Sequence, residues 1–196
     1  METAEEDFED LEKLQFLCTQ GVDKTGRRIL RIVGKHLPAP VVDTMRLKEF
    51  IQHKVSKELG SDQFCIVYFH TKVANKDNNP GILNLRWLYE SLSKNAKERL
   101  QVVYFVHPGL LSRTIMGTLG RFFLSEGLYH KLVYVSRLEF LWDYLKQGQV
   151  EVPDFVLDHD KELEHRPLMD YWIESDPLDA YGVAGGPSRR GASWAP

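Results

Sequence analysis

The fold class is set by the stretch QVVYFVHP, residues 101–108. Its β-branched and aromatic side chains predict a buried strand over 101–106, which ends at the pair His107 and Pro108. A mixed apolar segment then predicts a helix over about 110–123, and LVYV predicts a second strand over 132–135. Two strands joined through a helix are typical of a parallel pair in a sheet covered by helices.

The same alternation extends upstream and downstream of this stretch. FCIVYFH is a continuous apolar run that predicts a buried strand over 64–70, and ILRIVG predicts a strand near 28–33. Apolar residues at helical spacing predict amphipathic helices over 44–59 and 82–95, and a closing helix over 137–145. The order of elements therefore predicts an α/β fold, with helices flanking a mostly parallel sheet.

Both ends of the chain differ from this pattern. Apolar residues spaced by three predict a short helix over 5–17, so residues 1–20 are interpreted as an acidic N-terminal helix. Residues 21–165 form the expected α/β domain. The segment 166–196 is interpreted as a flexible tail, because its part from Pro177 onward is rich in Gly, Pro, Ser and Ala and cannot bury enough apolar surface to offset its ordering entropy. We expect a disordered tail there.

Composition and charge limit the classes of partner and compartment. The 196 residues carry a formal net charge of -3, but the acidic ends leave the middle of the chain mildly basic. That charge is compatible with an anionic lipid surface or an acidic partner, and is too weak to predict nucleic-acid binding. Cys18 and Cys65 form no disulfide framework. With no apolar run of membrane-spanning length and an acidic start, a cytoplasmic protein with peripheral membrane contact is expected.

Motifs for cofactor chemistry and catalysis are missing from the sequence. Neither GxGxxG nor GxxxxGK[ST] follows a predicted strand, so we expect no nucleotide cofactor. His107 could serve as an acid or base, but no Ser or Cys nucleophile with an orienting group is evident, which favours a hydrogen-bonded structural role. The Asp, Glu and His residues over 158–165 match no standard metal spacing. The sequence predicts a non-enzymatic protein without a metal site.

A family resemblance is carried by residues 101–145, closed by VPDFVLDHD at 152–160. This combination resembles divergent CRAL-TRIO domains, in particular the BCH type found in Rho GTPase-activating proteins and their relatives. In that type a strand ending in His-Pro precedes a long helix, a second strand and an exit of the form VPxxVL. The resemblance extends over about 24–160, and the segment 166–182 is similar to plant and algal members. It implies that one long helix closes over an apolar pocket, and that the domain either holds lipid or binds a partner protein.

The helix over 110–123 supplies most of the candidate pocket residues. Its apolar stripe is wider than one sheet face needs, which indicates either an ordinary buried helix or a mobile lid over a hydrophobic ligand. Gly117 and Gly120 each lower helix stability by about 1 kcal/mol, which fits close packing or movement. The predicted pocket lining is Phe69, Tyr104, Phe105, Leu111, Ile115, Leu119 and Phe122.

Cationic side chains near this stripe are candidates for a lipid headgroup. Arg113 and Arg121 share the helix, and Lys131 and Arg137 follow it. Arginine suits bidentate phosphate contacts, so Arg113 and Arg121 are predicted to meet a headgroup, with a solvated cationic face as the alternative. The sequence thus predicts a module that binds a phospholipid or similar amphiphile in lipid transfer or lipid-dependent signalling. The alternative is an interaction module that binds a small GTPase or other regulator without lipid, although the basic motif of the partner-binding BCH members is not intact.

Overall fold

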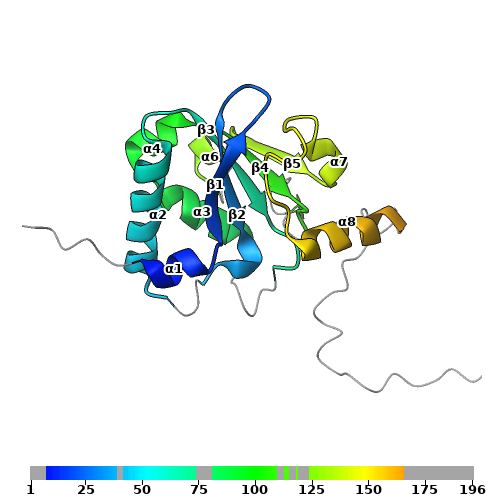
Figure 1. Ribbon diagram of the computed structural model, residues 1–196, viewed down its shortest axis with the longest axis horizontal. Helices are drawn as coiled ribbons and strands as arrows, with labels where there is room; N and C mark the ends of the chain where they lie inside the picture. Colours follow the sequence, from blue (N-terminus) through cyan, green and yellow to red (C-terminus); the bar gives the residue numbers. More distant parts are fainter. Residues whose placement is uncertain are drawn as a thin grey trace, which may run out of the picture.

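The fold is a five-stranded sheet with helices on both faces, seen in a computed structural model (Figure 1). The structure describes residues 8–38, 42–73, 81–109, 113–114, 118 and 124–165, without the side chains of 81–83. The strands are β1 (Leu17–Val22), β2 (Arg28–Val33), β3 (Phe64–Phe69), β4 (Leu100–Val106) and β5 (Leu132–Val135), and they lie in this order across the sheet. The pairs from β2 to β5 are all parallel, which confirms the four predicted strands and the predicted α/β class.

The first strand was not predicted, and it corrects the expected N-terminal helix. The helix α1 (Glu9–Lys13) is shorter than the predicted 5–17, and β1 already begins at Leu17. β1 pairs antiparallel with β2, so that Leu17 lies opposite Ile32 and Val22 opposite Arg28. The strand crosses the expected boundary at residue 20, because its backbone hydrogen bonds join it to the sheet.

One face of the sheet is covered by α2 (Thr44–Leu59), α3 (Gly81–Ser91), α4 (Lys94–Arg99) and the short α6 (Glu126–Tyr129). α2 begins after Asp43, whose carboxylate accepts hydrogen bonds from the amides of Met45 and Arg46, and it ends at Gly60 with φ of +51°. The single helix predicted over 82–95 is instead two helices, because the Ser93 hydroxyl caps a new helix by accepting from the Ala96 amide.

The other face is covered by α7 (Leu138–Leu141) and α8 (Asp154–His165). α7 is shorter than the helix predicted over 137–145. The closing phrase VPDFVLDHD, which was predicted only as an exit from the domain, forms most of α8. A 3-10 helix, η1 (Gly34–His36), follows β2. Two separate apolar cores therefore lie on the two faces of the sheet, one under α2 and one under α7 and α8.

Two predicted segments fall largely or wholly outside the described residues. Of the helix predicted over 110–123, only residues 113, 114 and 118 are described, and they are helical. The tail 166–196 lies outside the described chain. Among the helices that are described, none has the length and apolar character needed to cross a membrane.

Candidate ligand-binding site

Three aromatic rings lie together near the carboxyl ends of β3 and β4, on the face covered by α2. The rings of Tyr68 and Phe105 are stacked, with centroids 5.5 Å apart and an interplanar angle of 11°. The His70 ring stacks on Phe105 with a centroid distance of 5.0 Å. Alternate residues of a strand share a face, and Tyr68 is the register partner of Phe105, so the sheet itself brings these rings together. We call Tyr68, His70 and Phe105 the aromatic stack.

The aromatic stack is buried and uncharged at neutral pH. Burial lowers the pKa of His70 to about 4, so its imidazole is neutral. Burial also raises the pKa of Tyr68, whose side chain is completely enclosed. The Tyr68 hydroxyl has no hydrogen-bond partner among the described residues. The stack is therefore an aromatic surface that carries polar atoms and no net charge.

The pocket residues predicted on the sheet divide between its two faces. Phe105 belongs to the aromatic stack, but Phe69 and Tyr104 belong to the opposite core, under α7 and α8. The Tyr104 ring packs 4.8 Å from that of Tyr144, and its hydroxyl accepts from Arg27 Nη2 at 3.4 Å. Because consecutive strand residues point to opposite faces, Tyr104 and Phe105 cannot line one cavity on one face of the sheet.

Most of the predicted helix residues lie outside the described chain, namely Leu111, Ile115, Leu119, Arg121 and Phe122. The chain leaves the described part of the sheet at Gly109, beyond the carboxyl end of β4. It returns at Leu124, which is buried with Leu128 in the same core as Phe105. The described residues on either side of the predicted lid therefore lie beyond the carboxyl end of β4 and in the core to which Phe105 belongs.

The cationic residues predicted near a headgroup lie in different places. Arg113 is partly exposed beside the carboxyl end of β4, where its Nε donates to the carbonyl of Pro108 at 2.9 Å. Lys131 lies at the amino end of β4, and its ammonium donates to the carbonyls of Lys97 and Leu100 at 2.6 and 2.5 Å. Arg137 is 3.4 Å from the carboxylate of Asp160. Lys131 is therefore distant from any headgroup held near Arg113.

His107 joins the sheet to α8 through a buried hydrogen-bond network. Its Nε2 lies 3.0 Å from Asp160 Oδ1, and its Nδ1 lies 2.8 Å from the Thr71 hydroxyl. Burial opposes ionisation of Asp160, but the hydrogen bonds from His107 and the Leu138 amide keep the pKa of that carboxyl below its usual range. An ionised carboxylate only accepts, so Nε2 carries a proton and, in the neutral ring, Nδ1 accepts from Thr71. Nε2 of His107 thus holds α8 through Asp160, and Nδ1 is engaged by Thr71, which follows β3.

The acidic and histidine residues over 158–165 do not converge on one point. Asp160 faces His107, whereas Asp158 is exposed and lies 3.8 Å from Lys161. His159 Nδ1 is 3.7 Å from Glu162, and its ring contacts that of His107 edge-on. Within the ranges that the structure describes, no group of three or more His, Cys, Asp or Glu side chains is placed to hold a metal ion.

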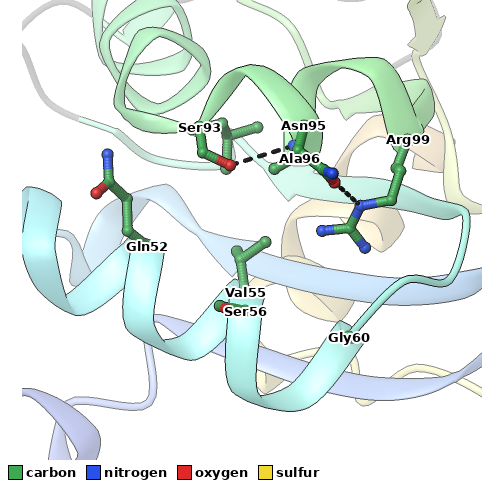
Figure 2. A pocket seen from close by; sticks show the side chains of 9 residues that line it. Gln52, Val55, Ser56, Gly60, Ser93, Asn95, Ala96 and Arg99 are labelled. Carbon is green, nitrogen blue, oxygen red and sulfur yellow. Dashed lines mark hydrogen bonds between the residues drawn. The ribbon is translucent and has the colours of Figure 1, made fainter.

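A separate hollow lies between α2 and α4 (Figure 2), with a volume of about 240 Å³. Its polar side chains include Gln52, Ser56 and Arg99, and the guanidinium of Arg99 donates to Asn95 Oδ1 at 2.7 Å. Gly60 lies shortly before β3 and Arg99 immediately before β4, so this hollow is at the amino end of the sheet, away from the aromatic stack. It is smaller than the usual range of about 300 to 1,000 Å³ for small-molecule pockets.

Sequence reasoning missed Tyr68 and His70, although a signal for them was present. The predicted pocket residue Phe105 lies near the carboxyl end of a buried strand, and residues 66, 68 and 70, on and just after the neighbouring strand, lie on the same face of the sheet. A parallel register between the two apolar runs would have selected Tyr68 and His70 in place of Phe69.

Vertebrate proteins of known sequence are similar to this chain. The chain is 31% identical over 155 residues to ganglioside-induced differentiation-associated protein 2 of Xenopus tropicalis, and the match covers 79% of this chain and 31% of that protein. The protein of the same name from Bos taurus is 30% identical over 173 residues, covering 88% of this chain and 34% of that protein. The chain therefore spans about a third of the length of these curated relatives.

A solved structure and a family model extend the comparison. The crystal structure of Sfh5 matches with a TM-score of 0.41 and 14% identity, over 83% of this chain and 68% of that one. The family model of the divergent CRAL/TRIO domain matches residues 26–162, which include β3, β4 and β5. This chain belongs to the divergent CRAL/TRIO domain family.

Proposed function

We propose that this chain is a non-enzymatic module that holds a phospholipid or similar amphiphile against the aromatic stack. The observation that carries the proposal is the stack itself, a buried and uncharged surface near the carboxyl ends of two parallel strands. Open α/β sheets place their ligands at that edge. The CRAL/TRIO family generally binds hydrophobic ligands, which supports the same class of ligand here.

The chemistry of the site favours binding over a reaction. Small-molecule sites are mostly apolar with a few placed polar groups, and the stack has this character. His107 is 4% exposed and uses both ring nitrogens within the fold, and the Thr71 hydroxyl beside it is 1% exposed. These groups stabilise the junction with α8, so we assign them no part in catalysis.

The polar end of the amphiphile is assigned to Arg113 and Arg121. Arg113 is partly exposed next to Pro108, at the same end of the sheet as the stack. A guanidinium there can donate two hydrogen bonds to one phosphate, which an ammonium cannot match in geometry. The lipid tails would then lie toward the stack, and the phosphate toward solvent and a membrane surface.

Extraction of phospholipid from vesicles tests this function. The purified chain, incubated with phosphatidylcholine and phosphatidylserine vesicles and then separated from them, is expected to carry bound phospholipid. Replacing Arg113 and Arg121 with alanine should lower binding to the anionic vesicles by about tenfold or more, since each surface cation near such a membrane contributes about 1 kcal/mol. The melting temperature should change little, because a partly exposed charge such as that of Arg113 contributes little to stability.

A matched pair of substitutions controls for total charge. Lys57 and Lys94 are exposed on α2 and α4, and their replacement by alanine removes the same charge from other helices. The control pair should bind vesicles nearly as the wild type does. An equal loss of vesicle binding in the arginine variant and in the lysine variant would show that Arg113 and Arg121 have no special role. If the chain extracts no lipid but binds a small GTPase, the lipid proposal is wrong and the protein-interaction alternative takes its place.

A further inference from the structure

We propose that the Tyr68 hydroxyl is the hydrogen-bond donor that selects the ligand, and that it favours amphiphiles with an uncharged oxygen acceptor, such as an ester carbonyl, near the stack. This inference rests on the proposed function, since it assigns the polar contact within the same site. It makes Tyr68 a specificity-determining residue.

The hydroxyl of Tyr68 is enclosed without a partner in the fold. The residue is 0% exposed, and no hydrogen-bond partner for its oxygen exists among the described residues. Buried tyrosine hydroxyls usually find a partner, because a lost bond to water is otherwise not replaced. Tyr104 illustrates the usual case on the other face of the same sheet, where the hydroxyl accepts from Arg27 Nη2. The exception at Tyr68 therefore calls for a ligand that supplies the acceptor.

The Tyr68 hydroxyl lies against Gly34, where the absence of a side chain leaves room for it. A Cβ atom added to Gly34, just beyond β2, would lie 2.5 Å from the Tyr68 oxygen and 3.0 Å from Val73 Cγ2. Only a glycine at position 34 allows the hydroxyl to occupy this place between the ends of β2 and β3. The ring is held by its stacking on Phe105 and His70, so the direction of the donor is set before a ligand arrives.

The surroundings favour a neutral acceptor over an anion. Burial raises the pKa of Tyr68, so the hydroxyl keeps its proton and can donate. Burial lowers the pKa of the adjacent His70 to about 4, so that ring carries no positive charge at neutral pH to offset a phosphate or carboxylate. Unpaired anions are costly in such surroundings, whereas an ester carbonyl accepts a hydrogen bond without bringing a charge.

The test compares Tyr68→Phe with Tyr104→Phe in the full chain. The probes are vesicles of dioleoyl phosphatidylcholine and of its ether-linked analogue, which has the same headgroup and lacks the ester carbonyls. The wild type should extract the ester lipid about five- to tenfold better than the ether lipid, the ratio expected for one hydrogen bond. Tyr68→Phe should lose most of that preference, and Tyr104→Phe should keep it.

The melting temperature of the ligand-free variants provides a second readout. Tyr68→Phe removes a donor that has no partner, so its ligand-free melting temperature should equal or exceed that of the wild type. A lowered melting temperature, or an unchanged ester preference in Tyr68→Phe, would show that the hydroxyl is satisfied within the protein or by water and would overturn the inference. If the wild type extracts both lipids equally, the inference fails while the proposed function stands. If it extracts neither, both fail.

Discussion

Replacing Asp160 with alanine is expected to lower the free energy of unfolding by about 2 to 4 kcal/mol, because two partly buried donors lose their acceptor and Arg137 loses its nearby carboxylate at once. Asp160 Oδ1 accepts from His107 Nε2 at 3.0 Å and from the Leu138 amide at 2.9 Å, and it is 3.4 Å from Arg137 Nε. The His107 side chain is 1% exposed, so water cannot easily take the place of the carboxylate. Urea denaturation measures the loss.

The matched control for this change is Asp158→Ala, two residues earlier on the same helix. Asp158 has 66% of its side chain exposed and makes only a 3.8 Å ion pair with Lys161. Such a pair contributes about 0 to 1 kcal/mol, so the control should be close to the wild type. Equal stabilities for the two variants would contradict the assignment of His107 and Asp160 as the tie between the sheet and α8.

A second large effect is expected at the turn between β1 and β2, where Asp23→Ala should cost about 3 to 5 kcal/mol. Asp23 is 4% exposed. Its Oδ1 accepts from the amides of Thr25 and Arg27 and from the Thr25 hydroxyl, and its Oδ2 accepts from Arg27 Nε at 2.6 Å. Removing the carboxylate leaves these donors without an acceptor and loosens the hairpin that carries β1. Urea denaturation at neutral pH measures the change.

The same carboxylate gives this prediction a pH dependence. Burial alone would raise the pKa of Asp23, but the hydrogen bonds from Arg27 and Thr25 hold that pKa below its ordinary value of 3.8. The contribution of the Asp23 carboxylate to the free energy of unfolding is therefore fully present above pH 3.8. It is lost as the pH falls through the pKa that Asp23 has in the folded state, which is lower than 3.8. The difference in unfolding free energy between the wild type and Asp23→Ala should become smaller in acid. Asp62→Ala, an exposed change before β3, should show neither the loss nor the narrowing.

Sequence patterns were sufficient for the elements that are buried on both faces or amphipathic throughout. All six residues of β3 are buried, so an unbroken apolar run is what the sheet requires there. α2 combines a helical apolar period with Asp43 before it and Gly60 after it, and both ends are as expected. In each case the signal is local and is contained within the element.

Elements held by distant contacts were not predictable in this way. β1 has one buried residue, Leu17, and becomes more exposed toward Val22, so it lacks the apolar pattern of a central strand. Part of its support comes from Gln149, whose side-chain oxygen accepts from the Val22 amide across 127 residues of sequence. α8 buries only Val156, and its Asp160 meets His107 across 53 residues. No local pattern indicates such pairings.

At the candidate site, too, local features could be predicted from the sequence and features that depend on distant contacts could not. The sequence predicted a ligand near the carboxyl ends of two apolar strands and selected aromatic residues there. The sequence did not separate the two faces of the sheet. Tyr104 and Phe69 were therefore grouped with Phe105, although both belong to the core on the opposite face. The register between β3 and β4 decides this grouping, and register depends on how the strands pair rather than on either strand alone.

Native mass spectrometry of the chain purified from cells shows whether a hydrophobic ligand is held against the aromatic stack. We expect an added mass that matches a phospholipid or similar amphiphile and is released on denaturation. Phe105→Leu should reduce the occupied fraction, because it removes the ring on which Tyr68 and His70 stack, while Leu157→Ala, an exposed change on α8, should not. A protein that carries no added mass, and that remains free of lipid after incubation with vesicles, would show that the aromatic stack holds no lipid.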